Sequence, residues 1–370
     1  MLSRAKYPEI WDRPGFPPLP VTATIFGNLV HRVVEQLGKK LSESGISSPQ
    51  AGDVVAVLGS LGGWRGIVLA AIEDELSKLG GNPRASTVRV DRVRDELERL
   101  APEAADQVKA FLGRGLLPKT QSSAKSAASA NSRHQQVRTP AALGAHPERE
   151  VTAEELRLTG QIDLLVIDQS DVAVTDFKTG TDNNAHDEQV RLYALLWYLD
   201  SETNPDARLA TKLKVAYPSY ERTVEAPDNS QLDALRRETS ARIEAADAIA
   251  GNPPPQAIPS EESCRYCPVK PICHTYWKSL PHPTAPMNNE EWLDFEGRAI
   301  RPNGSRSWFF ESTVDSPVEV LVRTFETDVA FPSGQKVRIL GARGSQDPDV
   351  PERPVISMTS TSEWYPVRAS

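Results

Sequence analysis

The hydrophobic residues in the first third of the chain recur with the period of an α-helix. One run places four apolar side chains at i, i+4, i+7 and i+11 on a single helix face: Phe26, Val30, Val33 and Leu37. Helical patterns also cover 51–79 and 87–112. The window 54–72 is the most apolar of the chain, but a serine, an arginine and four glycines interrupt it. This window therefore predicts a buried helix pair rather than a membrane span.

Between 151 and 180 the period changes to the two-residue alternation of a β-strand. Four apolar residues alternate there with polar ones: Leu158, Ile162, Leu164 and Val166. A polar turn follows at 168–171, and the apolar pattern restarts at Val172. The sequence predicts a β-hairpin whose second strand carries Asp176 and Lys178 on one face, because they are two residues apart.

The rest of the chain first mixes helical and strand patterns and then shows strands alone. The mixed part predicts a helix over 186–200, strands near 211–218 and 220–225, and a helix over 231–250. Beyond residue 290, short apolar runs are separated by Gly, Pro, Asp and Ser turns, at 305–313, 317–325, 336–341 and 354–360. These runs predict a small all-β, OB-like domain over 287–370.

Three aromatic residues of this β-rich part are candidates for stacking on single-stranded nucleic acid: Trp308, Phe309 and Trp364. The alternative is that they belong to the hydrophobic core, which is the commoner place for aromatic side chains in small barrels. The pattern alone does not separate the two interpretations.

Composition and charge set broad limits. A chain of 370 residues has room for two or three domains, and its formal net charge of −8 does not indicate a nucleic-acid binder. The segment 107–147 nevertheless contains six basic residues and no Asp or Glu. Its larger part, near 118–148, is rich in Ser, Ala and Gln and predicts a disordered or flexible basic insertion. Such an insertion is either a linker or a flap over a phosphate backbone.

The predicted hairpin also brings together side chains with a clear chemical implication. Asp163, Asp176 and Lys178 have no packing reason to meet just before a Thr-Gly turn. Carboxylate oxygens bind hard cations such as Mg²⁺, and an ammonium group can hold or deprotonate an attacking water. The hairpin therefore indicates a metal-dependent hydrolytic site.

Two further features fit such a site. His31 lies off the apolar stripe of its helix; alone it indicates a surface histidine, but beside the carboxylates it would be a metal ligand. Gln189 and Tyr193 are one helical turn apart, on a polar line distinct from the neighbouring leucines. Core packing explains the leucines, whereas a Gln–Tyr line beside an acidic site suits contact with a phosphate or a base.

The three cysteines of the chain form one compact motif, Cys264-x2-Cys267-x5-Cys273. Prolines within it break a helix and favour a tight loop of thiolates, which select zinc or iron–sulfur clusters. An odd, clustered set is not typical of a disulfide framework, and no apolar leader follows Met1–Lys6. We therefore expect a cytoplasmic protein that does not act on membranes.

Taken in order, these motifs resemble the RecB-like branch of the PD-(D/E)XK nucleases over residues 20–280. The resemblance rests on Gly27-x3-His31, Gly160-x2-Asp163, Asp176-x-Lys178, Gln189-x3-Tyr193 and the cysteine motif. It is greatest to the iron–sulfur members, namely the AddB-type nuclease domains and the CRISPR-adaptation nucleases. The resemblance implies a restriction-endonuclease-like α/β core, a mixed central sheet flanked by helices, within a nuclease domain over 1–280.

The resemblance also implies roles for individual residues. Mg²⁺ or Mn²⁺ would be bound by His31, Asp163, Asp176 and the backbone carbonyl of Phe177. Lys178 would orient or activate the water, and Gln189 and Tyr193 would position the DNA strand and that lysine. The cysteines would hold a 4Fe–4S cluster.

One departure from the iron–sulfur members concerns the fourth cluster ligand. Those members carry a cysteine upstream of the motif histidine, and residues 1–30 contain none. A non-cysteine ligand would complete the cluster, with Asp12, His274 and His282 as candidates, or the site would hold zinc, or no cluster at all.

The sequence thus predicts a metal-dependent deoxyribonuclease. The expected substrate is single-stranded DNA ends, exonuclease action is favoured over endonuclease action, and a helicase or a repair, recombination or defence complex is the expected partner. The alternative is a catalytically weak nuclease fold that serves such a complex as a DNA-binding subunit. A third interpretation is a zinc-binding interaction module in which the cysteines are the functional site.

Overall fold

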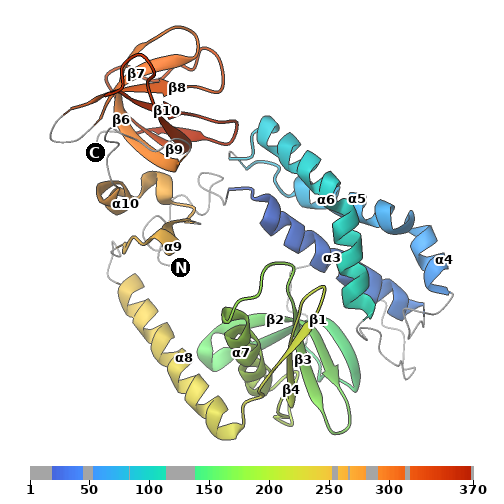
Figure 1. The fold of residues 1–370 in the computed structure, drawn as a ribbon. Coiled ribbons are helices and arrows are strands. Elements are labelled where there is room, and N and C mark those ends of the chain that lie inside the picture. Colours follow the sequence, from blue (N-terminus) through green and yellow to red (C-terminus); the bar gives the residue numbers. More distant parts are fainter. Residues whose placement is uncertain are drawn as a thin grey trace. The chain divides into compact units, whose positions relative to one another are not determined.

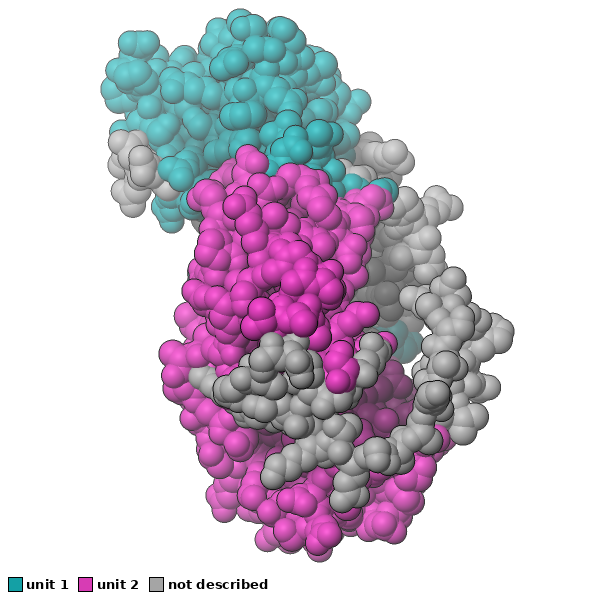
Figure 2. Space-filling view, turned by 90° about the vertical axis from the view of Figure 1, so that its right-hand side faces the viewer, with its two compact units in different colours: residues 1–19, 81–91, 249–370 teal, residues 20–80, 92–248 magenta. Residues whose placement is uncertain are grey.

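A computed structural model describes most of the chain: residues 19–44, 53–82, 84–113, 138–251, 257–265, 267–280, 291–312 and 317–367 (Figure 1). The chain divides into two compact units, each built from separate segments. The first, which we call the sheet unit, comprises 20–80 and 92–248. The second, the barrel unit, comprises 1–19, 81–91 and 249–370, and Figure 2 colours the two differently.

A five-stranded mixed sheet forms the centre of the sheet unit, in the order β1-β2-β3-β4-β5 (Figure 1). The strands are β1 (Gly144–Ala153), β2 (Leu158–Ile167), β3 (Val172–Phe177), β4 (Lys212–Ala216) and β5 (Glu221–Val224). Only β3 and β4 are parallel, and the three other neighbouring pairs are antiparallel. The expected mixed sheet is therefore confirmed, and so is the β2–β3 hairpin.

Helices cover both faces of this sheet. On one face α7 (Ala185–Leu199) buries Val190, Ala194 and Trp197 against strand residues of the same hydrophobic core. On the other face Phe177 of β3 contacts the ring of Phe111 at 4.8 Å between centroids. Because strand β3 is buried on both sides, its apolar pattern is nearly continuous.

Phe111 belongs to the group of helices that precedes the sheet in the sequence. These are α3 (Thr22–Glu43), α4 (Asp53–Ser60), α5 (Gly63–Ser77) and α6 (Thr87–Gly113). The four residues of the predicted stripe on α3 are all buried: Phe26, Val30, Val33 and Leu37. Within the described residues no single helix is long and apolar enough to cross a membrane, and only α4 and α5 together pass that test, bent by 46°.

Strand β1 was not expected from the sequence. The predicted insertion near 118–148 lies largely at 114–137, outside the described residues, but 144–148 form the first half of β1. Only Val151 and Ala153 of this strand are buried, and it contains Pro147. An edge strand tolerates proline and polar residues on both faces, so it lacks the alternation that identifies a strand.

The short 3₁₀ helix η1 (Glu154–Leu156) connects β1 to β2, while α8 (Asn229–Ala250) follows β5. Both predicted helices after the hairpin, 186–200 and 231–250, thus agree with α7 and α8 to within two residues at each end. Leu232 is the buried residue of α8, and Leu235 and Ile243 of this helix are partly buried against the same core.

The barrel unit contains six strands in the order β10-β8-β7-β6-β9-β11, and β10 also pairs with β9. They are β6 (Trp292–Pro302), β7 (Ser307–Ser312), β8 (Glu319–Arg323), β9 (Lys336–Gln346), β10 (Pro354–Ser357) and β11 (Glu363–Pro366). The β9–β10 pairing closes a ring of five strands, in which β8 and β10 are parallel. Strands β6 and β11 were not expected from the sequence, and the predicted domain division near 280–287 stays a prediction.

Two of the three aromatic residues proposed for stacking contribute to the packing of this barrel. Trp308 packs edge-on against Phe331 and donates its Nε1 hydrogen to the carbonyl of Val329. Trp364 packs against the same Phe331, with ring centroids 5.0 Å apart. Phe309 instead lies beneath the guanidinium groups of Arg301 and Arg353, at 4.2 and 5.2 Å.

The cysteine segment also belongs to the barrel unit. It consists of α9 (Glu261–Arg265), the 3₁₀ helix η2 (Lys270–Ile272) and α10 (His274–Ser279). Asp294 of β6 holds it through Lys270 Nζ at 2.8 Å and the hydroxyl of Tyr276 at 2.6 Å. Arg338 of β9 donates to the carbonyl of Pro271 at 2.8 Å. The segment is thus attached to the barrel by buried and half-buried polar contacts.

Gly160 offers a test of the packing between α7 and β2. A Cβ at this position would lie 2.7 Å from Leu196 Cδ1 and 3.1 Å from Tyr193 Cε1. Because both partners are packed in the core, we expect Gly160→Ala to destabilise the protein by about 1–3 kcal/mol. Thermal unfolding of the purified protein measures the change.

Gly38→Ala is the matched control, since it adds the same methyl group to the interior of α3. A Cβ there meets nothing within 4 Å. Alanine is the better helix former, so this variant should gain about 0.5–1 kcal/mol. Equal melting temperatures for the two variants would contradict the described contact between α7 and β2.

Candidate active site

Helix α3 carries His31 to the edge of the central sheet. Gly27, one helical turn earlier, permits this approach, because a Cβ there would lie 3.2 Å from the hydroxyl oxygen of Thr179. Thr179 follows β3 in the Asp-Phe-Lys-Thr-Gly segment. The spacing Gly27-x3-His31 thus has a structural reason. Gly27 lets α3 lie close to Thr179, and His31, one helical turn later, then reaches the edge of the sheet.

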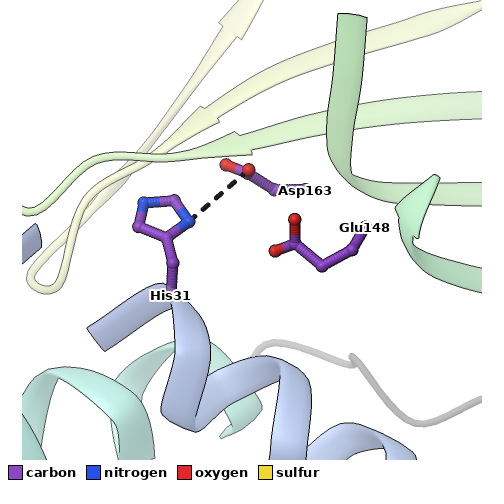
Figure 3. Close-up of side chains that lie close together, drawn as sticks. All are labelled: His31, Glu148 and Asp163. Atoms are coloured by element: carbon purple, nitrogen blue, oxygen red, sulfur yellow. Dashed lines mark ion pairs between the residues drawn. The ribbon is translucent and has the colours of Figure 1, made fainter. Parts of the chain in front are cut away.

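His31 meets Asp163 of β2 at this edge. Its Nδ1 lies 3.5 Å from Asp163 Oδ1, as the dashed line in Figure 3 marks. The other carboxylate oxygen of Asp163 accepts a hydrogen bond from the backbone N–H of Phe177 at 2.5 Å. Asp163 therefore connects the helix to both strands of the predicted hairpin.

Glu148 completes a group of three candidate metal ligands. The register of β1 and β2 runs from Pro147 opposite Leu164 to Arg149 opposite Ile162, which places Glu148 opposite Asp163. One ligand atom from each of His31, Glu148 and Asp163 lies within 4.8 Å of the others, and the three side chains converge in Figure 3. No other such group occurs among the described residues.

The backbone is irregular where these two carboxylates face each other. Glu148 has a φ of 50°, in the left-handed region that a residue with a side chain rarely adopts. On β2, Ile162 and Leu165 both belong to the core beneath α7, although a spacing of three places residues on opposite faces of a regular strand. The strict alternation expected for β2 therefore breaks at Asp163.

Asp176 lies beside this group and is nearly inaccessible, with 1% of its surface exposed. Its Oδ2 lies 2.8 Å from Lys178 Nζ, which provides the opposite charge. The two side chains share one face of β3, as their spacing indicated. A buried carboxylate oxygen with spare bonding capacity is suited to a cation.

Lys178 also connects β3 to α7. Its Nζ donates to Gln189 Oε1 at 2.8 Å, and Gln189 Nε2 donates to the Tyr193 hydroxyl oxygen at 2.9 Å. The residues predicted to align on one side of the helix thus form a continuous chain of hydrogen bonds. This chain leaves Lys178 with little freedom to rotate away from Asp176.

The pKa values of the ionisable side chains at this site are shifted, in part because several negative charges lie close together. Burial and the charge of Asp163 raise the pKa of Glu148 to about 7. Burial and the same charge raise the pKa of Asp176 to about 6, against the opposing effect of Lys178. Burial lowers the pKa of His31, but its interaction with Asp163 outweighs this, so that the pKa is raised. A divalent cation would relieve this repulsion, because it favours the ionised carboxylates.

The donor set fits such a cation. Carboxylate oxygens are the ligands of Mg²⁺ and Mn²⁺, and one imidazole nitrogen is compatible with Mn²⁺ in particular. Glu148 was missed by sequence reasoning because its strand was missed. The available signal was its position: it is the first acidic residue after the acid-free segment 107–147.

A pocket of about 480 Å³ opens beside these ligands. Its lining is mainly polar and comes from α3, α5 and the first two strands: Asn28, His31, Arg32, Glu35, Gln36, Lys39, Glu75, Lys78, Glu148 and Gln161. Arg32 and Lys78 both pair with the buried carboxylate of Glu75. The pocket therefore combines the candidate metal ligands with basic groups able to contact a phosphate.

The cysteines form a separate cluster in the barrel unit. Cys264 and Cys267 are half-buried and Cys273 is buried. Burial raises the pKa of the Cys267 thiol, and among the described residues the three sulfur atoms do not form a group within 4.8 Å of one another. Of the candidate fourth ligands, His274 directly follows Cys273 and its Nδ1 lies 3.5 Å from Arg338 Nη2. Asp12 and His282 lie outside the described residues.

Comparison with protein families gives one match. The model of the PD-(D/E)XK nuclease superfamily matches residues 6–274. Since this is well over half of the chain, the chain belongs to the PD-(D/E)XK nuclease superfamily. Asp176-Phe177-Lys178 has the form of the (D/E)XK triplet in that name, while the residue before Asp163 is Ile162 rather than proline.

Membership defines the class of activity and cofactor. The superfamily consists of nucleases, so the activity it indicates is cleavage of nucleic acids, and its members use divalent metals. The group of His31, Glu148 and Asp163 is consistent with that requirement. The comparison with curated protein sequences gives no match.

Several solved structures show weak similarity. The tetrameric p202 HIN2 structure is 18% identical with a TM-score of 0.20, covering 25% of this chain and 51% of that one. Fission yeast Pot1 with ssDNA is 7% identical with a TM-score of 0.18, covering 31% and 48%. SSO0001 is 15% identical with a TM-score of 0.24, covering 56% and 80%. The chain thus spans about half the length of the first two structures. TM-scores this low support no conclusion about fold or function.

The crowded carboxyl groups have a consequence for stability in the absence of metal. In the unfolded chain Glu148 and Asp176 ionise near their ordinary values of 4.5 and 3.8, but in the fold near 7 and 6. Between about pH 4 and pH 7 the unfolded state therefore gains free energy of ionisation that the folded state lacks. We expect the melting temperature of the metal-free protein to fall by a few degrees across this range.

Thermal unfolding in chelator at pH 5.5 and pH 8 measures this loss, and added Mg²⁺ or Mn²⁺ should restore stability mainly at pH 8. Glu148→Gln is the matched variant, because the amide resembles the protonated acid and cannot ionise. Its melting temperature should depend less on pH than that of the wild type. An identical pH dependence would show that Glu148 does not carry the effect.

Proposed function

We propose that this protein is a metal-dependent DNA nuclease that cleaves single-stranded ends, as an exonuclease. The observation that carries the proposal is the convergence of His31, Glu148 and Asp163 beside the Asp176–Lys178 pair. Two carboxylates, an imidazole and a positioned lysine are the groups that phosphodiester hydrolysis requires. If Asp176 and Lys178 formed only a structural ion pair, the site would not need His31 from α3 or Glu148 from β1.

Each residue has a distinct role in this proposal. His31, Asp163 and Asp176 would hold the metal together with the backbone carbonyl of Phe177, and Glu148 would add a carboxylate to the set. When bound, the metal stabilises the charge that develops on the phosphate and lowers the pKa of the attacking water. Lys178 holds that water.

Two hydrogen-bonded neighbours keep Lys178 in place. Asp176 lies 2.8 Å from its ammonium group, and Gln189 accepts a hydrogen bond from it at 2.8 Å. Tyr193 fixes the Gln189 amide in turn, and burial raises the pKa of the tyrosine to about 12, so that its hydroxyl stays protonated. Gln189 and Tyr193 are therefore positioning residues for the lysine and for the DNA strand beside it.

The preference for single strands is supported by the barrel. Five strands close into a ring with one parallel pair, β8–β10, which fits the OB-like domain that we propose for this region. Such barrels bind single-stranded nucleic acids through aromatic and basic side chains. Phe309, with Arg301 and Arg353 over its ring, supplies both kinds.

Within the sheet unit, the pocket beside the metal ligands offers basic groups for the phosphate backbone. Lys39 and Lys78 line it together with His31. These groups support contact with a phosphate backbone. From the resemblance to RecB-like nucleases we further propose action on DNA made available by a helicase, in a cytoplasmic complex for repair, recombination or defence.

We further propose that Cys264, Cys267 and Cys273 hold a 4Fe–4S cluster, with zinc as the alternative occupant. Three cysteines within ten residues supply most of a ligand set. Freshly purified protein should then be brown, and Cys267→Ser should lose both the colour and the bound iron. Metal analysis decides between the two occupants, since a zinc protein is colourless. Protein with neither metal would contradict the proposal.

Cleavage of labelled single-stranded DNA with Mn²⁺ tests the nuclease proposal. Asp176→Ala should lower the rate by about 100- to 1000-fold, because it removes both a metal ligand and the partner of Lys178. Asp171→Ala is the matched control: this aspartate precedes the same strand at its other end and pairs with Lys212. Undiminished cleavage by Asp176→Ala would refute the proposal.

DNA binding measured with and without metal tests the alternative of a DNA-binding subunit. A pure binding module should retard DNA equally well in Mn²⁺ and in chelator and should leave the label intact. The proposed enzyme should release labelled nucleotides with Mn²⁺ and only bind in chelator.

A further inference from the structure

Two stacked tyrosines lie where β4 and β5 meet, outside the residues assigned to the reaction. The rings of Tyr217 and Tyr220 are 4.6 Å apart between centroids and inclined by 18°. Tyr217 is buried with 2% exposure, whereas Tyr220 is 42% exposed. Tyr220 is therefore the solvent-exposed member of the stack.

The register of the sheet places this stack beside the catalytic lysine. Phe177 of β3 lies opposite Ala216 of β4, and the N–H of Lys178 donates to the carbonyl of Ala216 at 2.9 Å. Tyr217 follows Ala216, and its own N–H donates to the carbonyl of Tyr220 at 2.8 Å. Neighbouring strands lie about 5 Å apart, so the backbone of Tyr220 is about 10 Å from that of Lys178.

Lys178 and the tyrosine stack also share the α7 side of the sheet. Lys178 donates to Gln189 of α7, and Tyr217 belongs to the hydrophobic core beneath the same helix. His186 at the start of α7 places its Nδ1 2.7 Å from the Tyr217 hydroxyl. The charge of Lys178 contributes, after burial, to lowering the pKa of His186, which independently places the lysine near the stack.

A polar cluster fixes the orientation of both rings. Asp182 accepts hydrogen bonds from the Tyr217 hydroxyl at 2.9 Å and from the Tyr220 hydroxyl at 2.6 Å. Arg222 pairs with Asp182 and also donates to Asp187 at 2.6 Å. An exposed ring that is already fixed in place loses little conformational freedom when a flat ligand stacks on it.

We propose that Tyr220 is a stacking platform for a nucleobase of the single-stranded substrate, one or two nucleotides from the phosphate being cleaved. This inference rests on the proposed nuclease function and adds a determinant of substrate form. A base in a duplex is stacked within its own helix, so the platform favours unpaired bases. Every base has a π face, so the contact would not depend on sequence.

A simpler role for Tyr220 would be to tie the β4–β5 turn to Asp182 through its hydroxyl. The two roles depend on different parts of the side chain. Stacking needs the ring, which Tyr220→Phe keeps and Tyr220→Ala removes. The turn-tying role needs the hydroxyl, which both variants remove.

Steady-state cleavage of a single-stranded oligonucleotide with Mn²⁺ separates the roles. We expect Tyr220→Ala to raise KM by roughly 5- to 100-fold with little change in kcat, since one base stack is lost. Tyr220→Phe should retain most of the affinity. An oligonucleotide whose bases are replaced by abasic sites should bind wild type and Tyr220→Ala alike. Equal KM values for wild type and Tyr220→Ala, or equal losses for both variants, would overturn the proposal.

A binding measurement keeps this test independent of catalysis. Full-length protein carrying Asp176→Ala is titrated with a single strand containing 2-aminopurine, whose fluorescence is quenched when the base stacks. Quenching that persists with Tyr220→Phe and disappears with Tyr220→Ala supports the platform, whether or not the wild-type protein cleaves DNA. Quenching unchanged by Tyr220→Ala overturns it. The melting temperature of each variant confirms that it is folded.

Discussion

Repulsion between carboxylates held at one edge of the central sheet is the constraint on which the candidate active site depends. Asp163 faces both Glu148 and Asp176, and its charge is a cause of the raised pKa of each. Side chains that repel one another stay together only where the surrounding structure leaves them no alternative. Here the core beneath α7 and the hydrogen bond from Phe177 to Asp163 supply that restraint.

Two glycines, Gly27 before His31 and Gly160 before Asp163, allow close packing of helices on the sheet at this site. Gly27 lets α3 approach Thr179, and Gly160 lets α7 approach β2. A larger side chain at either position would push a helix away from the sheet, and would move His31 of α3 away from Asp163 or Gln189 of α7 away from Lys178. The glycines are therefore part of the site, although neither contributes a chemical group to it.

Much of this arrangement could be predicted from the sequence because it is local. The spacing of Asp176 and Lys178 determines a shared strand face, and the spacing of Gln189 and Tyr193 determines a shared helix face. Glu148 could not be found this way, because its edge strand lacks apolar alternation and its place opposite Asp163 arises from pairing between strands. The irregular backbone at Glu148 likewise follows from tertiary structure and has no signal in the local pattern.

Each unit is built from separate segments of the chain, and this affects where the chain can be cut. The barrel unit includes 81–91, which the sequence places inside the helical part of the nuclease. Arg84 and Arg89 from this segment pair with Glu363 near the end of the chain, and all three side chains are largely buried. A protein cut before the barrel would lose that carboxylate and leave two guanidinium groups without it. Removing residues 249–370 therefore does not remove the whole barrel unit, because its segment 81–91 stays in the remaining chain.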